Sequence, residues 1–379
     1  MSKKTIVKIC IFTFVILFGV VSIGLHFRNL SKSAKEFFGE PIWVFKPQDT
    51  IFSSLADDTS YLFIQTPDLI YSLNVDSGKT LWQKEALAGP TYGASMKKSG
   101  DTLFAPEKNG TIAAYSLKTG ETIWKDSPKV GAARIEDMNI NNNTIYVARY
   151  SRHLTAYDLV NGKLLWEKDV PSRTELFVMP DEEKVYLSTS ESLFVYDSHT
   201  GELLGEYKLN KFAQHMEKKD EIVYLANYKE KGFSFSALDL NSFETKWTIS
   251  KRNPSVTSSI DSMIFENDIL YGIGNPIVAV SMSSGDILWI SDKKENYKSS
   301  VINGNEIYAV DRSYLYILDK ASGIEKKRIP LPGIPLPGIT FPPLISWLFG
   351  SDTNLFISND LLIVVSNNQV NGYKLPLTQ

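Results

Sequence analysis

The chain of 379 residues is poor in the residues that most often build metal and redox sites. Its single cysteine, Cys10, lies in an apolar run near the N-terminus, which excludes an intrachain disulfide and a cysteine metal site. The four histidines show no ligand spacing to one another and are expected to be exposed: His26, His153, His199 and His215. We therefore predict no metal site built on these residues.

One segment has the outline of a calcium loop. Asp137, Asn139 and Asn141 alternate along the chain, as the ligands of such a loop do. However, Asn142 stands where the loop needs glycine, and the closing glutamate is missing. The surrounding pattern places Asp137 and Asn139 in or beside a strand, so we predict no calcium site here.

An excess of positive charge is also missing. Lys and Arg number 40 against 43 Asp and Glu, for a net charge of −3. The first 35 residues contain no acid, so the rest of the chain is more acidic than this figure suggests. They contain six basic residues: Lys3, Lys4, Lys8, Arg28, Lys32 and Lys35. Binding to duplex nucleic acid needs a basic face, so nucleic acid is not expected as a partner.

The N-terminal segment has the pattern of a membrane anchor. Met1–Lys8 is basic, and Ile9–Leu25 has no charged side chain. This run exceeds the roughly 7–15 residues of a signal-peptide core and reaches the roughly 17–25 of a spanning helix. We predict one transmembrane helix in residues 1–28, with an uncleaved signal anchor favoured over a cleaved signal, and a linker in residues 29–40. The basic N-terminus then stays in the cytoplasm, and the remainder lies on the extracytoplasmic side of the cell membrane.

The rest of the chain repeats one pattern. An apolar strand leads into a turn that ends in glycine, and a tryptophan follows four residues later, first at Gly78 and Trp82. The pattern recurs at Gly120 and Trp124, Gly162 and Trp166, and Gly285 and Trp289. The steps from Trp82 to Trp124 and from Trp124 to Trp166 are both 42 residues. A period of about 40 residues made of short strands indicates a radial or stacked repeat, of which the β-propeller is one kind.

Each repeat contains four short strands separated by turn residues, as antiparallel blades require. In the second repeat we expect strands at Thr91–Lys97, Thr102–Pro106, Thr111–Leu117 and Glu121–Lys125. Small residues in the third strand, such as Ala114, let neighbouring sheets approach closely.

The repeats number eight. The third strands are marked by one apolar residue each: Leu73, Tyr115, Tyr157, Tyr196, Leu238, Val280, Leu318 and Tyr373. The eighth repeat lacks a fourth strand, and Pro41–Phe45 has the pattern of one. We predict an all-β, eight-bladed propeller over residues 41–379, closed by this N-terminal strand, which removes the open edge of the ring.

Three positions depart from the repeat. Gly205 and Lys327 replace the tryptophan in repeats four and seven, and Phe243 replaces the turn glycine in repeat five. We expect the blades at these positions to pack more loosely.

The repeat resembles that of the quinoprotein-like (PQQ-like) propellers, over about residues 40–379. The size, the anchor and the closing strand most resemble the BamB-type propellers, which are scaffolds of bacterial envelope assembly. The resemblance implies that the repeat tryptophans pack between adjacent blades: Trp43, Trp82, Trp124, Trp166, Trp247 and Trp289.

The resemblance identifies the fold more closely than the function, because scaffolds and quinone-cofactor dehydrogenases share the repeat. Many of those dehydrogenases have a vicinal cysteine pair and calcium ligands, and this sequence shows neither. We therefore predict no catalytic residue and no cofactor. The predicted function is a non-catalytic scaffold that binds other membrane or envelope proteins, in envelope or outer-membrane protein assembly. The alternative is a quinone-dependent dehydrogenase, or a sensor of a small ligand or carbohydrate, that uses the central channel.

Residues 330–350 interrupt the repeat most strongly. The segment has no charged residue and contains Pro-Leu-Pro-Gly-Ile twice, which favours a polyproline II conformation. It links blades seven and eight, where the other links are about four residues long. The candidate contacts to a partner are its apolar side chains: Phe341, Leu344, Trp347, Leu348 and Phe349. The alternative is a loop that folds over the disc and covers exposed core.

Overall fold

The structure is a computed structural model. It describes residues 40–57, 60–85, 94–107, 110–126, 134–150, 152–170, 177–189, 191–209, 213–227, 232–252, 260–291, 297–311, 314–331, 354–366 and 368–375. No helix within these ranges is long and apolar enough to cross a membrane. The anchor predicted in residues 1–28 lies outside the described residues.

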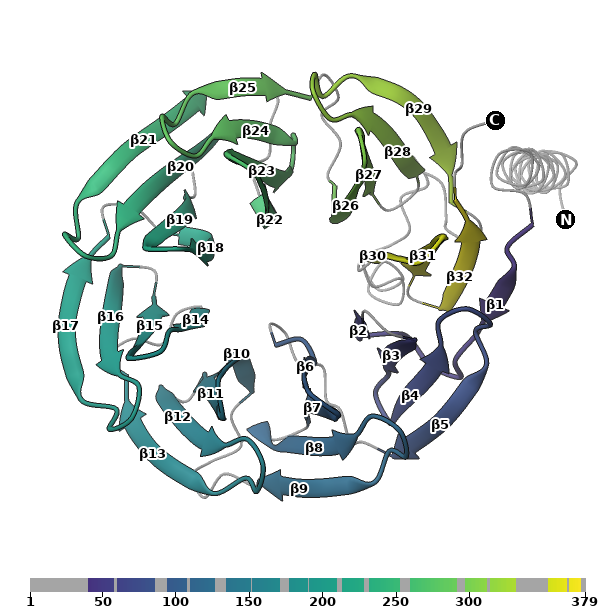
Figure 1. The fold of residues 1–379 in the computed structure, drawn as a ribbon, viewed down its shortest axis with the longest axis horizontal. Coiled ribbons are helices and arrows are strands. Elements are labelled where there is room, and N and C mark those ends of the chain that lie inside the picture. Colours follow the sequence, from purple (N-terminus) through teal and green to yellow (C-terminus); the bar gives the residue numbers. More distant parts are fainter. Residues whose placement is uncertain are drawn as a thin grey trace, which may run out of the picture.

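The described residues form eight four-stranded antiparallel sheets arranged as the blades of a ring (Figure 1). The innermost strands are β2 (Ser53–Ala56), β6 (Lys97–Ser99), β10 (Ile135–Asn141), β14 (Phe177–Pro180), β18 (Ala213–Lys219), β22 (Ile260–Glu266), β26 (Ser299–Asn303) and β30 (Asn354–Ser358). The second strands are β3 (Tyr61–Gln65), β7 (Thr102–Pro106), β11 (Thr144–Arg149), β15 (Lys184–Ser188), β19 (Ile222–Asn227), β23 (Ile269–Gly274), β27 (Glu306–Val310) and β31 (Leu361–Ser366).

The third strands are β4 (Leu69–Asn74), β8 (Ile112–Ser116), β12 (His153–Asp158), β16 (Ser192–Asp197), β20 (Gly232–Asp239), β24 (Val278–Ser281), β28 (Tyr314–Asp319) and β32 (Gln369–Lys374). The outermost strands are β5 (Thr80–Glu85), β9 (Thr122–Asp126), β13 (Leu164–Asp169), β17 (Leu203–Lys208), β21 (Thr245–Arg252), β25 (Ile287–Ile290), β29 (Glu325–Pro330) and β1 (Trp43–Phe45). The predicted all-β propeller with eight blades is confirmed.

The closing strand is also confirmed. β1 pairs with β32, with Trp43 opposite Gly372 and Phe45 opposite Val370. The backbone N–H of Ile42 extends the ladder by donating to the carbonyl of Gly372 at 2.8 Å. The first and last segments of the propeller therefore share blade eight, and strand β32 does not present an open edge.

The hydrophobic core lies between the blades. Eight apolar clusters can be distinguished, and each joins side chains from two neighbouring blades. Second and third strands are covered by a neighbour on both faces, which is why β31 is buried at every position. The cluster at the closure packs Trp43 and Val370 of blade eight against Leu62 and Tyr71 of blade one.

The predicted strands of the second repeat agree with the structure except for the first. The sequence predicts a strand over Thr91–Lys97, of which residues 91–93 lie outside the described residues. In the described part, β6 covers Lys97–Ser99 and pairs Ser99 with Thr102. Gly100 and Asp101 form the whole connection, and Gly100 has a positive φ of 52°. This two-residue hairpin turn continues the ladder farther than the apolar pattern indicated.

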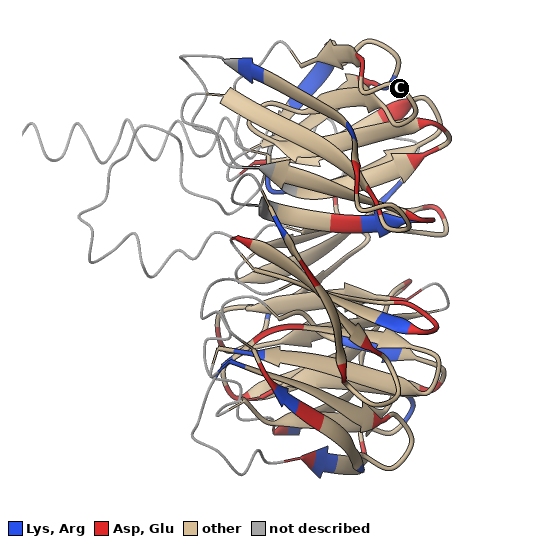
Figure 2. Cartoon of the chain, turned by 90° about the vertical axis from the view of Figure 1, so that its left-hand side faces the viewer, with Lys and Arg blue, Asp and Glu red and all other residues tan. Residues whose placement is uncertain are grey.

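The disc has two different faces. Hairpin turns between strands one and two and between strands three and four form one face, and the remaining connections form the other. Many of the Asp and Glu residues lie on the loops along one side of the disc, as Figure 2 shows.

Candidate functional site

The repeat tryptophans lie at the junctions between neighbouring blades. Five of them donate from Nε1 to a backbone carbonyl in the turn of the following blade: Trp82 to Leu117 (2.7 Å), Trp124 to Leu159 (3.0 Å), Trp166 to Ser198 (2.9 Å), Trp247 to Met282 (2.9 Å) and Trp289 to Lys320 (3.1 Å). The sixth, Trp43, packs its ring against Gly78 of blade one, but its buried Nε1 has no hydrogen-bond partner among the described residues.

Each of these rings lies directly on the turn glycine of the following blade. A Cβ built on Gly162 would lie 2.6 Å from the ring of Trp124, and one on Gly120 would lie 2.7 Å from the ring of Trp82. Gly162 has a positive φ of 70°. The position therefore requires glycine for two reasons, the left-handed backbone and the absence of a side chain.

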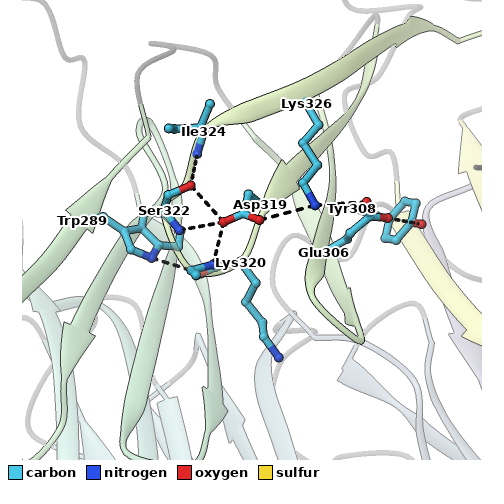
Figure 3. A network of polar contacts seen from close by, with 9 residues as sticks. Trp289, Glu306, Tyr308, Asp319, Lys320, Ser322, Ile324 and Lys326 are labelled. Carbon is cyan, nitrogen blue, oxygen red and sulfur yellow. Dashed lines mark hydrogen bonds and ion pairs between the residues drawn. The ribbon is translucent and has the colours of Figure 1, made fainter.

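The turn around each of these glycines is held by its own polar side chain. In blade seven, Asp319 accepts from the backbone N–H of Ser322 at 3.0 Å and pairs with Lys326 at 3.4 Å (Figure 3). Lys326 also reaches Glu306, and Trp289 of blade six donates to the carbonyl of Lys320 in the same turn. The hydroxyl of Ser322, which donates to Asp319 at 2.9 Å, acts with the Lys326 ammonium and the Ser322 backbone N–H to hold the pKa of Asp319 below its usual value.

A small residue lies opposite each tryptophan within its own blade. These residues are Ser72, Ala114, Ala156, Ala237, Ala279 and Gly372. In the two blades without the tryptophan, larger residues take this place: Val195 is opposite Gly205, and Ile317 is opposite Lys327. The small residues of the third strand thus make room for the indole ring.

Loose packing is expected from the sequence for the blades that depart from the repeat, but blades four and five are in close contact. Tyr207 of blade four stacks on Phe243 of blade five, with ring centroids 3.4 Å apart and an interplanar angle of 1°. The ring of Tyr207 also covers Gly205, on which a Cβ would lie 3.1 Å away. The aromatic contact is kept, but it is made by different residues. Lys327 occupies the tryptophan position of blade seven, and the following blade eight has no hairpin turn between its third and outermost strands because β1 comes from the N-terminus.

Asp137 and Asn139 join two innermost strands. Asp137 of β10 accepts from the backbone N–H of Val178 in β14 at 2.8 Å, and Asn139 donates to the carbonyl of the same residue at 3.3 Å. The side chains that resemble calcium ligands in sequence therefore hold the inner edge of blade four. No group of three or more His, Cys, Asp or Glu residues that could hold a metal ion occurs in the described ranges.

Burial raises the pKa of Asp137 to about 6. Lys97 and the backbone N–H groups of Val178 and Met138 act in the opposite direction, and Glu217 adds a smaller increase. The buried position of Asp137 between blades three and four thus disfavours its ionised form.

Other buried charged groups also serve the packing. Asp57 accepts from the backbone N–H groups of the turn that it begins and pairs with Lys98 of blade two at 3.2 Å. Glu107 binds both the hydroxyl of Tyr115 and the ammonium of Lys125. Arg149 donates to the carbonyl of Gly110 in the preceding blade at 3.1 Å.

The predicted partner residues lie outside the described residues: Phe341, Leu344, Trp347, Leu348 and Phe349. The structure describes the points where the insertion leaves and rejoins the propeller. Leu331 follows β29, is only 6% exposed and packs in the core between blades seven and eight, and Asn354 begins β30.

The outermost strands carry a repeated surface feature that the sequence analysis missed. Each outermost strand that follows a hairpin within its blade has a β-bulge immediately before the tryptophan position. The extra residue is an exposed aliphatic in five blades: Leu81, Ile123, Leu165, Leu204 and Leu288. Ile42, before Trp43, is 54% exposed. An aliphatic residue before the repeat tryptophan is the sequence signal that could have revealed this feature.

Gly162 and Gly100 provide a matched test of the blade junction. Both have a positive φ, but a Cβ on Gly100 would meet nothing within 4 Å. We expect Gly162→Ala to lower the free energy of unfolding by about 3 kcal/mol, because backbone strain and overpacking against Trp124 add together. Gly100→Ala should lower it by only about 1 kcal/mol. Urea unfolding of both variants measures the difference, and equal losses would contradict the proposed role of the ring contact.

The raised pKa of Asp137 gives a pH-dependent prediction. The folded protein holds this proton more tightly than the unfolded chain, so its contribution to stability is present below pH 3.8 and is lost as the pH rises through about 6. The stability of the parent relative to Asp137→Asn should therefore fall by up to about 3 kcal/mol between pH 4 and pH 7. Chemical unfolding of both proteins across this range tests it, and a constant difference would contradict it.

Comparison with known proteins supports this architecture. A family model described as outer membrane protein assembly factor BamB matches residues 66–217 and 108–328. No curated protein matches the chain.

Solved structures with the same fold have low sequence identity to the chain. The crystal structure of BamB from Moraxella catarrhalis is 16% identical, with a TM-score of 0.64 over 88% of this chain and 99% of that chain. The computationally designed Ika8 protein is 12% identical, with a TM-score of 0.69 over 89% of this chain and 100% of the designed one. A europium-containing methanol dehydrogenase is 12% identical, with a TM-score of 0.64 over 87% and 85% of the two chains.

These structural similarities concern the fold alone, since both a protein named BamB and a dehydrogenase share it. The family model, by contrast, spans more than half of the chain. The chain therefore belongs to the PQQ_2 family of β-propellers, whose description is outer membrane protein assembly factor BamB.

Proposed function

We propose that the chain is a membrane-tethered, extracytoplasmic β-propeller that acts as a non-catalytic scaffold for other envelope proteins. The family description names outer-membrane protein assembly, and the proposal extends that role to this chain. The tether is the helix predicted in residues 1–28, on the basis of its basic start and its uncharged run Ile9–Leu25.

The observation that carries the proposal is the exposed aliphatic side chain at one repeated position of the outermost strands. Leu81, Ile123, Leu165 and Leu204 occupy this position in four consecutive blades and are 46–55% exposed. A single exposed leucine is ordinary on a protein surface, but a repeated set on neighbouring blades is typical of an interaction surface.

The use of the charged groups supports a role without chemistry. An enzyme needs acids and bases that converge on a substrate. Here Asp137, Glu107 and Arg149 bind backbone or side-chain groups that hold strands and blades together. We propose that residues 330–350 provide further partner contacts, since their uncharged composition suits the centre of an interface.

Replacement of the apolar side chains of the insertion tests the scaffold role. Serine should be introduced at Phe341, Leu344, Trp347, Leu348 and Phe349 of the full chain. We expect cross-links to other envelope proteins in the native cell to fall by at least about tenfold, because the interface anchors are removed. Thermal unfolding should be unchanged.

Ile324→Ser is the matched control, because Ile324 is an exposed aliphatic residue of the adjoining blade seven and is 55% exposed. Cross-linking that is as strong in the five-fold variant as in the parent would contradict the contact role of the insertion. The absence of any cross-linked envelope protein with the parent chain would overturn the scaffold proposal. A second arm adds pyrroloquinoline quinone and calcium to the purified chain, and dye reduction with alcohols or sugars would overturn the non-catalytic part.

A further inference from the structure

Blades three and four present the densest group of exposed aliphatic side chains among the described residues. We name this group the aliphatic strip. Its five members are 46–67% exposed: Val160, Leu164, Leu165, Leu203 and Leu204. Two successive leucines are exposed at the start of both β13 and β17, so the usual alternation of buried and exposed residues along a strand is interrupted there.

The members of the strip lie on two adjoining blades. Trp166, next to Leu165, lies on Gly201 and donates to the carbonyl of Ser198. Gly201 belongs to the turn that leads directly into Leu203. The junction that holds blades three and four together thus brings the two leucine pairs to the same part of the rim.

The strand edges beneath the strip are poorly suited to strand addition. β13 and β17 are outermost strands, and each has its bulge at the leucine pair, where the register shifts opposite Tyr157 and Tyr196. A bulge twists an edge and interrupts the row of backbone groups that an added strand would need. A partner is therefore expected to contact the strip through side chains, as an amphipathic helix does with its apolar face.

The charges around the strip indicate the sign of the charge expected on the partner. Residues 158–169 and 197–208 contain six Asp and Glu residues but only three Lys. Glu167 and Asp169 follow Leu165 at two-residue steps along β13, and their side chains are 43% and 86% exposed. Of the lysines, Lys208 is paired with Glu206. Complementary charge on the partner is therefore positive.

We propose that the aliphatic strip docks an amphipathic helix of a partner protein, with aliphatic residues on one face and Lys or Arg at its borders. This inference rests on the proposed scaffold function and specifies one class of partner for it. The strip lies on blades three and four, whereas residues 330–350 follow blade seven and precede blade eight in the sequence.

The test uses the full chain and a synthetic amphipathic helix of about 18 leucines and lysines, with leucine at positions i, i+3, i+4 and i+7. Fluorescence anisotropy measures its affinity. We expect the double variant Leu165→Ser, Leu204→Ser to bind at least about tenfold more weakly than the parent, because two anchors of the interface are lost. Both side chains are about half exposed, so thermal unfolding should be unchanged.

Leu288→Ser is the matched control, since Leu288 occupies the same bulge position in blade six and is 49% exposed. The Leu288→Ser variant should bind the peptide with the same affinity as the parent. A peptide with glutamate in place of lysine, and one with the same residues in scrambled order, should both bind the parent at least about tenfold more weakly. Equal binding by the double variant and the parent, equal binding of the three peptides, or no binding by the parent would overturn the proposal.

A second copy of this chain and a lipid surface are the two alternative occupants of the strip, and the same double variant tests both. Sedimentation velocity shows whether the double variant abolishes an association between copies of this chain, and flotation shows whether it abolishes binding to phosphatidylcholine–phosphatidylglycerol vesicles. If the double variant loses self-association or vesicle binding but still binds the peptide like the parent, the proposal is overturned. If the peptide does not bind at the strip while envelope proteins still cross-link to the parent chain, the docking proposal fails and the scaffold function stands. If the peptide binds as expected but no envelope protein cross-links, the scaffold function fails instead.

Discussion

The contact between a tryptophan of one blade and the turn glycine of the next is the interaction on which the ring depends. It sets how closely two blades approach, because the indole ring fills the space where a side chain on Gly120 or Gly162 would lie. It also fixes their register, since Nε1 donates to one particular carbonyl of the turn. The same contact at Trp43 and Gly78 joins the two ends of the propeller.

The exceptions to the repeat show that the two residues of this contact change together. Where blade five has Phe243 in place of glycine, blade four has Gly205 in place of tryptophan, and Tyr207 supplies the ring. Lys327 stands in place of tryptophan in blade seven, where the following blade has no turn for an indole to cover. A change on one side of a junction is therefore accompanied by a change on the other, as expected for residues that share one packing space.

The fold could be predicted because its determinants recur at a fixed spacing. The glycine and tryptophan pattern gave the period of about 40 residues, the third-strand positions gave the number of blades, and Pro41–Phe45 could be assigned to the closure. The partners of Asp137 and Tyr207 could not be predicted in this way. Asp137 binds the backbone of Val178, which has no side-chain signature, and Tyr207 stacks on a residue of another repeat. Leu165 has the sequence pattern of a core strand residue, but it is the extra residue of a bulge and is 48% exposed.

The constraints on the ring differ between its strands, and this difference indicates where function is to be sought. Second and third strands are covered by neighbours on both faces, so their residues are determined by packing. The bulge position of the outermost strands is exposed, and in blade seven its Lys326 pairs with Asp319 of the turn that Trp289 binds. This position holds leucine or isoleucine in blades one to four, but lysine in blades five and seven. The aliphatic side chains on consecutive blades form no such ion pair, and the partner proposed for them gives a reason for their exposure.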